Sequence, residues 1–184
     1  METPNTTRTA LHNAVLKVVL HMWNQTRGQH WLPITGCSML PLLREGDSIL
    51  VAHGSAGVCR GDVVVFRQQG RLTAHRVVCI SGSKDHPTLI TKGDNAAQCD
   101  PPVSANGIVG RVLAVKRDGQ CLPLDTTARR VAGWLLAASA CTWCTRARWS
   151  RRRKQRRRGP QPHRWMAFLR RRAWAIFLRV FTMV

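Results

Sequence analysis

Hydrophobic residues are spaced in different ways along the chain, and the changes mark its parts. Between Leu11 and Met22 apolar residues recur at helical spacing, which predicts an amphipathic helix of about four turns. From about Ile34 to Val115, short β-branched runs alternate with Gly, Asp and Asn, and no long helical period intervenes. This texture predicts antiparallel strands joined by tight turns. The expected strands cover residues 48–51, 63–66, 72–80, 89–91 and 108–115.

After Leu124 the chain becomes basic. A short apolar stretch, Val131 to Trp143, precedes a run of basic residues at 151–158 that is expected to be disordered on its own. Residues 164–184 place several arginines on one side of a helical wheel and large apolar residues on the other, as in interfacial helices. We therefore expect an N-terminal amphipathic helix and lead-in (1–33), a β domain (34–124) and a basic, partly amphipathic helical tail (125–184).

Charge is concentrated in the predicted tail. The chain has 184 residues and a net charge of +20, and residues 121–184 alone hold 16 Lys plus Arg against one Asp, which gives +15. With 44% hydrophobic residues the chain can bury a core, so it is not a disordered polycation. The tail is expected to bind an anionic membrane surface, with nucleic acid as the less favoured partner.

No apolar segment reaches the roughly 20 residues that span a bilayer. The N-terminus also lacks the pattern of a secretory signal, because polar residues interrupt its apolar stretch. We therefore expect a peripheral membrane or cytoplasmic protein.

Candidate chemistry lies in five blocks within the β region. The blocks are Gly36-Cys37-Ser38-Met39-Leu40-Pro41, Arg44-Glu45-Gly46-Asp47-Ser48-Ile49-Leu50-Val51, Arg60-Gly61-Asp62-Val63-Val64-Val65-Phe66, Ala74-His75-Arg76-Val77-Val78 and Lys92-Gly93-Asp94-Asn95. In this order they resemble the type I signal peptidase family of membrane-associated serine endopeptidases. The resemblance implies a mainly β fold, the antiparallel catalytic domain of signal peptidases and LexA, with no cofactor and no metal.

The resemblance also implies a role for each candidate site residue. Ser38 stands where the family has its nucleophile, and a hydroxyl needs a base within hydrogen-bond reach. His75 matches the base of the histidine branch of the family, typical of archaea and the endoplasmic reticulum. In that branch an acidic residue orients the imidazole, and Asp100, six positions after Asp94, matches its place. Asp94 is the alternative acid, although its other role would be to fix the turn.

A binding site for the oxyanion is implied next to the nucleophile. The family uses the backbone N–H of the serine, sometimes with a hydroxyl two residues earlier. Here that earlier position is Gly36, so main-chain donors of the Gly36–Met39 segment are expected, with Thr35 as a candidate supplement.

The implied function is hydrolysis of peptide bonds in peptide or protein substrates, after small residues. Two alternatives stay open. One is a self-cleaving regulator of the LexA type, which shares the Ser-Met-x-Pro start but uses lysine as base. The other is a non-catalytic β domain whose Arg-rich tail binds nucleic acid through its phosphates.

Overall fold

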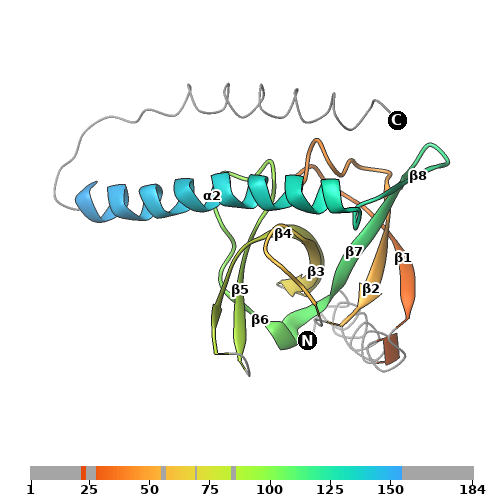
Figure 1. Ribbon diagram of the computed structural model, residues 1–184, viewed down its shortest axis with the longest axis horizontal. Coiled ribbons are helices and arrows are strands. Elements are labelled where there is room, and N and C mark those ends of the chain that lie inside the picture. The colour runs from red at the N-terminus through yellow and green to blue at the C-terminus, as the bar shows by residue number, and fades with distance from the viewer. Residues whose placement is uncertain (1–21, 24–27, 55–56, 69, 84–85, 155–184) are drawn as a thin grey trace, which may run out of the picture. The chain divides into compact units, whose positions relative to one another are not determined.

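The protein is described here by a computed structural model, which covers residues 22–23, 28–54, 57–68, 70–83 and 86–154, with side chains up to Cys141. Its main feature is an antiparallel sheet (Figure 1). The strands are β1 (Gln29–Pro33), β2 (Ser48–His53), β3 (Val63–Gln68), β4 (Arg71–Gly82), β5 (Pro87–Lys92), β6 (Val103–Ser104), β7 (Ile108–Arg117) and β8 (Gln120–Pro123). A short 3-10 helix, η1 (Ala105–Gly107), precedes β7, and the helix α2 (Thr127–Lys154) follows β8. The expected mainly β fold is confirmed.

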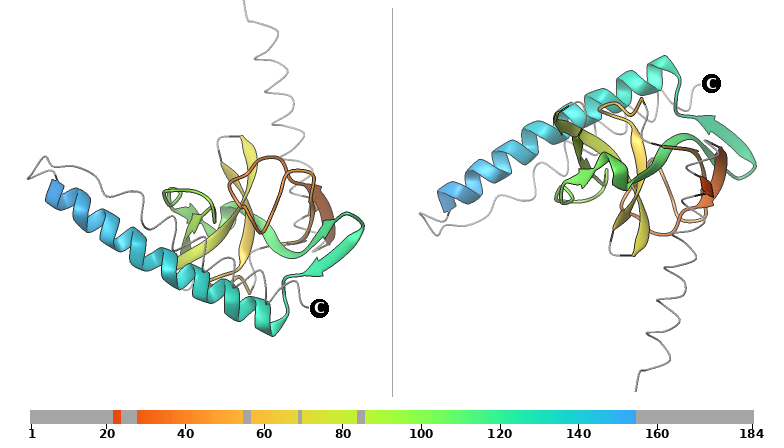
Figure 2. Two further views of the ribbon diagram at one scale, coloured as in Figure 1. Left: turned by 90° about the horizontal axis from the view of Figure 1, so that it is seen from above. Right: turned by 90° about the horizontal axis from the view of Figure 1, so that it is seen from below.

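Strand β7 lies in the middle of the sheet although it comes late in the sequence. The strand order is β1-β2-β7-β3-β4-β5-β6, and β8 pairs with β7 outside this path. Figure 1 shows β1 and β2 at one edge, β5 and β6 at the other, and β3 and β4 between them. In both views of Figure 2, β8 folds back along the end of β7. The sheet is therefore complete only when distant parts of the chain have paired.

The interior of the sheet is built on β3. Val63, Val64, Val65 and Phe66 are all buried. Since successive side chains of a strand point to opposite faces, both faces of β3 are covered. Val64 and Phe66 belong to a core cluster that also includes residues of β4, β5 and β7: Val77, Leu89 and Ile108. Val64 lies directly opposite His75 on β4, so the core fixes the strand that carries this histidine.

The part of α2 up to Cys141 belongs to the same compact unit as the sheet, and this unit ends at Cys141. Ala137 of this helix is fully buried, whereas Val131, Trp134 and Leu135 are exposed. The sequence predicts disorder for the isolated basic run, but residues 151–154 continue α2. Arg and Lys are good helix formers, and an existing helix extends into such residues at low cost.

Three strands were not expected from the sequence: β1, β6 and β8. β1 has few β-branched residues, yet it pairs along its whole length with β2, from Gln29 opposite Ala52 to Pro33 opposite Ser48. It falls within the segment expected to be a lead-in. Of the helix expected between Leu11 and Met22, only Met22 is described, and both it and the next residue, Trp23, are helical. The rest of that helix and the expected helix at 164–184 lie outside the described residues. Over the ranges described, no helix has the length and hydropathy to cross a bilayer.

Candidate catalytic site

Ser38, His75 and Asp100 form a continuous row of hydrogen bonds. The imidazole Nε2 of His75 lies 3.0 Å from Oγ of Ser38. On the other side of the ring, Nδ1 lies 2.6 Å from Oδ2 of Asp100. An ionised carboxylate only accepts hydrogen bonds, so Nδ1 carries the hydrogen toward Asp100. Nε2 is then left to accept a hydrogen bond from the Ser38 hydroxyl.

Ser38 lies on a tight turn between β1 and β2. Within this turn the N–H of Leu40 donates to the carbonyl of Cys37 at 3.2 Å, and the N–H of Leu43 donates to that of Met39 at 3.0 Å. Met39 and Leu43 are buried, whereas Ser38 is exposed. The apolar side chains thus hold the turn against the core and leave the hydroxyl accessible to a substrate.

His75 lies in the middle of β4 and is 7% exposed. The ring of Phe66 on β3 packs edge-on against the imidazole, with the ring centroids 6.0 Å apart. Both ring nitrogens are engaged, one by a carboxylate and one by a hydroxyl. The side chain is therefore held in one orientation by packing and by hydrogen bonds at both ends.

Thr91 holds Asp100 in place. Its hydroxyl donates to Oδ2 of Asp100 at 2.8 Å, and its carbonyl accepts from the N–H of Asp100 at 2.8 Å. Thr91 is fully buried on β5. This role of Thr91 was not expected from the sequence, where its one signal is its position directly before the Lys92-Gly93-Asp94-Asn95 block.

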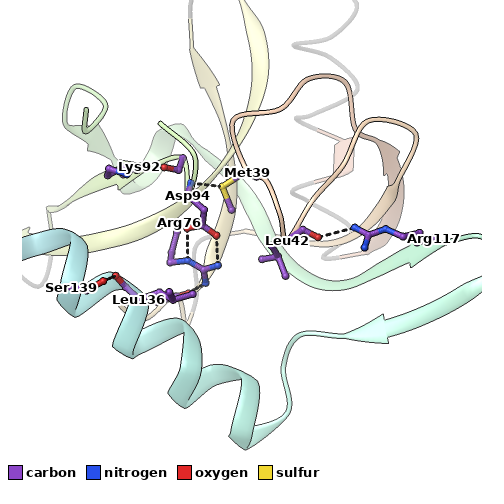
Figure 3. A network of polar contacts seen from close by, with 10 residues as sticks. Met39, Leu42, Arg76, Lys92, Asp94, Arg117, Leu136 and Ser139 are labelled. Atoms are coloured by element: carbon purple, nitrogen blue, oxygen red, sulfur yellow. Dashed lines mark hydrogen bonds and ion pairs between the residues drawn. The ribbon is translucent and has the colours of Figure 1, made fainter. Parts of the chain in front are cut away.

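Asp94, the alternative acid, pairs with an arginine. Its carboxylate receives two hydrogen bonds from Arg76, at 2.9 Å from Nε and 2.6 Å from Nη2 (Figure 3). Both side chains are less than 10% exposed, at 6% and 7%. Nη1 of Arg76 donates in addition to the carbonyl of Gly61 at 2.8 Å. Of the two acids considered, Asp100 is the one that reaches His75 in the structure.

The turn formed by residues 93–95 supports the main chain around Ser38. The N–H of Asn95 donates to the carbonyl of Ser38 at 2.8 Å, and its side-chain amide donates to the carbonyl of Cys37 at 3.2 Å. The N–H of Asp94 lies 3.4 Å from the sulfur of Met39 (Figure 3). A Cβ at Gly93 would lie 2.6 Å from the carbonyl oxygen of Ser38 and 3.1 Å from Nε2 of His75. Only glycine allows this close approach.

The two residues before the Cys37-Ser38 pair, expected near a site for an oxyanion, are exposed. Gly36 has a φ of +101°, and a Cβ there would meet no atom within 4 Å. Thr35 is exposed. Within the described ranges, no backbone hydrogen bond uses the N–H of Ser38 as donor. Likewise, the described residues contain no group of three or more His, Cys, Asp or Glu that could hold a metal ion.

Two comparisons with known proteins show what the chain is similar to. Residues 5–113, more than half of the chain, match the model of the family described as Peptidase S24-like. Over 65 residues the chain is 40% identical to the signal peptidase complex catalytic subunit SEC11 of Yarrowia lipolytica, a stretch that covers 34% of this chain and 38% of that protein. The chain thus matches less than half the length of this relative. Because the match covers more than half of the chain, including Ser38, His75 and Asp100 and all of strands β1 to β6, the chain belongs to the Peptidase S24-like family.

Proposed function

We propose that the protein is a serine endopeptidase of signal peptidase type, with Ser38 as nucleophile, His75 as general base and Asp100 as the acid that orients it. One observation carries the proposal: the unbroken row from Oγ of Ser38, through both ring nitrogens of His75, to Oδ2 of Asp100. Nucleophile, base and orienting group in contact are the elements that activate a serine in unrelated peptidases.

In the first half of the reaction, Oγ of Ser38 attacks the carbonyl carbon of the substrate. The hydroxyl proton passes to Nε2 of His75, and the resulting imidazolium is stabilised by the carboxylate of Asp100. Collapse of the tetrahedral intermediate breaks the C–N bond, and the proton on Nε2 passes to the leaving amine. The product of this half is an ester between the substrate acyl group and Ser38.

In the second half, His75 takes a proton from a water molecule as the water attacks the ester. The proton then returns to Oγ of Ser38 as the acid product leaves. In both halves the oxyanion would be stabilised by the backbone N–H of Ser38, which has no backbone acceptor among the described residues, with Thr35 as a candidate supplement.

The substrate is proposed to be a peptide or protein cleaved after small residues. This preference comes to the chain from its resemblance to signal peptidases, and the SEC11 relative is described as the catalytic subunit of a signal peptidase complex. The exposed position of Ser38 on its turn suits a main chain that approaches from solvent.

An anionic membrane surface is the proposed location of the reaction. The net charge of +15 on residues 121–184 supports attraction to anionic lipids, at about 1 kcal/mol for each Lys or Arg near the surface. On the described part of α2, exposed Val131, Trp134 and Leu135 add an apolar contact next to Arg129 and Arg130. Trp and apolar side chains beside basic ones are typical of interfacial helices.

The test is incubation of the purified protein with a peptide library, read by mass spectrometry, with and without vesicles that contain anionic lipid. Ser38→Ala, His75→Ala and Asp100→Asn should each lose cleavage, while Ser104→Ala and His86→Ala, at exposed positions, serve as matched controls. Cleavage that persists in Ser38→Ala would refute the proposal. Intact-mass analysis separates the alternatives, because a self-cleaving regulator would shorten its own chain. Oligonucleotide binding without any cleavage would favour the non-catalytic reading.

A further inference from the structure

We infer that α2 controls the geometry of the catalytic site. Its contact with Gly61 positions Arg76, and Arg76 positions the turn of residues 93–95 that holds the main chain at Ser38. The inference rests on the proposed function, and it concerns how that site is controlled. Helix α2 lies beyond residues 5–113, the part of the chain that matches the family.

The first link is a direct contact between two backbones. A Cβ on Gly61 would lie 2.5 Å from the backbone nitrogen of Trp134 and 2.7 Å from the carbonyl carbon of Gly133. A Cβ on Gly133 would lie 2.7 Å from the carbonyl oxygen of Gly61. Side chains at either position would push the helix away, so this pair of glycines allows α2 to rest on the turn before β3.

The second link is Arg76, which lies at this contact. A Cβ on Gly133 would come within 3.0 Å of Nη1 of Arg76, and the same nitrogen donates to the carbonyl of Gly61 at 2.8 Å. Figure 3 shows the guanidinium between the helix on one side and Asp94 on the other. If α2 moved away, water would reach an ion pair that is now almost fully buried, and the attraction between its charges would weaken.

The third link joins this ion pair to the nucleophile. Asp94 is held through both carboxylate oxygens by Arg76, and its neighbour Asn95 donates to the carbonyl of Ser38. On the other side of Asp94, Gly93 faces the Ser38 carbonyl and the His75 ring. Any displacement of the Asp94 carboxylate therefore acts on the residues that set the distance between Ser38 and His75.

A second contact presses the helix onto the same turn. Nη2 of Arg60 donates to the carbonyl of Ala137 at 3.3 Å, and its guanidinium lies 5.7 Å from the ring centre of Trp134. We call these two contacts of the Arg60 guanidinium with α2 the clamp. Because Arg60 and Gly61 are neighbours in sequence, the clamp and the glycine contact hold the helix at the same turn. Weakening the clamp should loosen α2 without adding any atom to the interface.

The decisive variant is Gly133→Ala. Alanine raises helix propensity, so a loss of function could not come from melting of the helix itself. Ser139→Ala is the matched control on the same helix, at an exposed position. Arg60→Ala is the second variant, and it loosens the helix by removing contacts rather than by adding a clash.

Hydrogen exchange measured by mass spectrometry tests the inference without any substrate. In Gly133→Ala and Arg60→Ala, peptides that contain residues 93–96 should exchange at least several-fold faster than in the wild type, and Ser139→Ala should match the wild type. Faster exchange confined to α2 would overturn the inference, as would exchange unchanged everywhere. Because this readout does not depend on cleavage, it stays informative even if the endopeptidase proposal fails.

Kinetics then tests whether the effect reaches the chemistry. Gly133→Ala should lower kcat roughly 10- to 100-fold with little change in KM, as expected for misplaced reacting groups. Combined with Arg76→Lys, it should add little further loss, because both changes act through one guanidinium. Independent, multiplying losses would contradict the proposed link through Arg76. Activity retained by Ser38→Ala would instead contradict the proposed function itself.

Discussion

The hydroxyl of Thr91 and the carboxylate of Asp100 are joined by a 2.8 Å hydrogen bond to Oδ2, the oxygen that also faces Nδ1 of His75. One carboxylate oxygen thus receives donors from both sides. The arrangement fixes the direction in which the acid meets the imidazole, and it leaves the acid no other orientation without loss of a donor.

Thr91→Val should therefore lower activity while keeping the shape of the side chain. A hydrogen bond to a charged group contributes about 1.5–3 kcal/mol, so kcat/KM should fall roughly 10- to 100-fold. Thr91→Ser retains the hydroxyl and should stay close to the wild type. Steady-state kinetics on one cleaved peptide compares the variants, and equal activity of the Val and Ser variants would show that the hydroxyl does not matter.

Gly93→Ala should abolish cleavage with only a moderate loss of stability. The new methyl group would press on the carbonyl oxygen of Ser38 and on the His75 ring, which separates nucleophile from base. Gly107→Ala is the control, because its methyl would meet only one side-chain atom of the described residues, Cγ1 of Val103, at 3.3 Å, and no backbone atom. Cleavage rates are compared with thermal unfolding of the same samples. A Gly93→Ala protein that cleaves at the wild-type rate would contradict the geometry described for this turn.

Asp47 should make stability depend on pH in the acid range. Burial alone would raise the pKa of its carboxyl, but hydrogen bonds from Arg117 and from the N–H of Arg44 outweigh it, so the pKa is lowered on folding. Its contribution is therefore complete above the pKa of the unfolded chain, about 3.9, and is lost as the pH falls through the lower pKa of the folded state.

Asp47→Asn tests this contribution. At pH 7 it should lower the free energy of unfolding by about 2 kcal/mol, since Arg117 loses its ionised partner. In urea unfolding the difference from the wild type should shrink as the pH falls below about 4. The exposed neighbour Glu45, changed to Gln, provides the control. A difference that stays constant with pH would exclude this carboxylate as the cause.

His53 should make the folded protein less stable as the pH falls, because its imidazole is buried without an ionic partner in the part of the chain that the structure describes. Burial lowers the pKa of its imidazole and the nearby His30 lowers it further, which together outweigh the opposing effect of the Val109 backbone. The folded protein thus resists protonation here, and stability falls as the pH drops through the ordinary histidine pKa of about 6.5. Neither ring nitrogen of His53 has a hydrogen-bond partner among the described residues.

His53→Leu should therefore stabilise the protein by about 1 kcal/mol at pH 8, because an unsatisfied buried group is removed. The gain should be larger at pH 5.5, because the folded wild type also resists protonation of His53 there. The ring centroids of Trp23 and His53 are 4.9 Å apart, so a leucine in place of His53 would still pack against the apolar ring of Trp23. Urea unfolding at the two pH values gives the comparison. A variant with the same pH dependence as the wild type would show that His53 is not the group that titrates.

The strands with a strong local signal could be predicted from the sequence. β3 and β7 carry runs of β-branched residues, and both were expected close to their observed ends. β1 was missed because its five residues offer no such run, and its pairing with β2 is what makes it a strand. A strand of this kind depends on tertiary contacts that no local pattern reveals.

The site shows the same division. Ser38, His75 and Asp100 were candidates because each lies in or near a recognisable block. In the sequence Thr91 is an ordinary strand residue, because its role depends on Asp100, nine positions away. The pairing of Arg76 with Asp94, and the approach of Gly133 to Gly61, arise only from the path of the folded chain.

The late position of β7 in the sequence has a consequence for synthesis of the protein. The row that joins Ser38 to Asp100 needs β4 and β5 in place, and these strands are held on the sheet through β3, which pairs with β7. A growing chain that has not yet released residues 108–117 from the ribosome therefore lacks the strand that links β2 to β3. The activity proposed for this row would therefore appear only after β7 has emerged and paired with β2 and β3, and a chain still short of β7 would be inactive toward its neighbours.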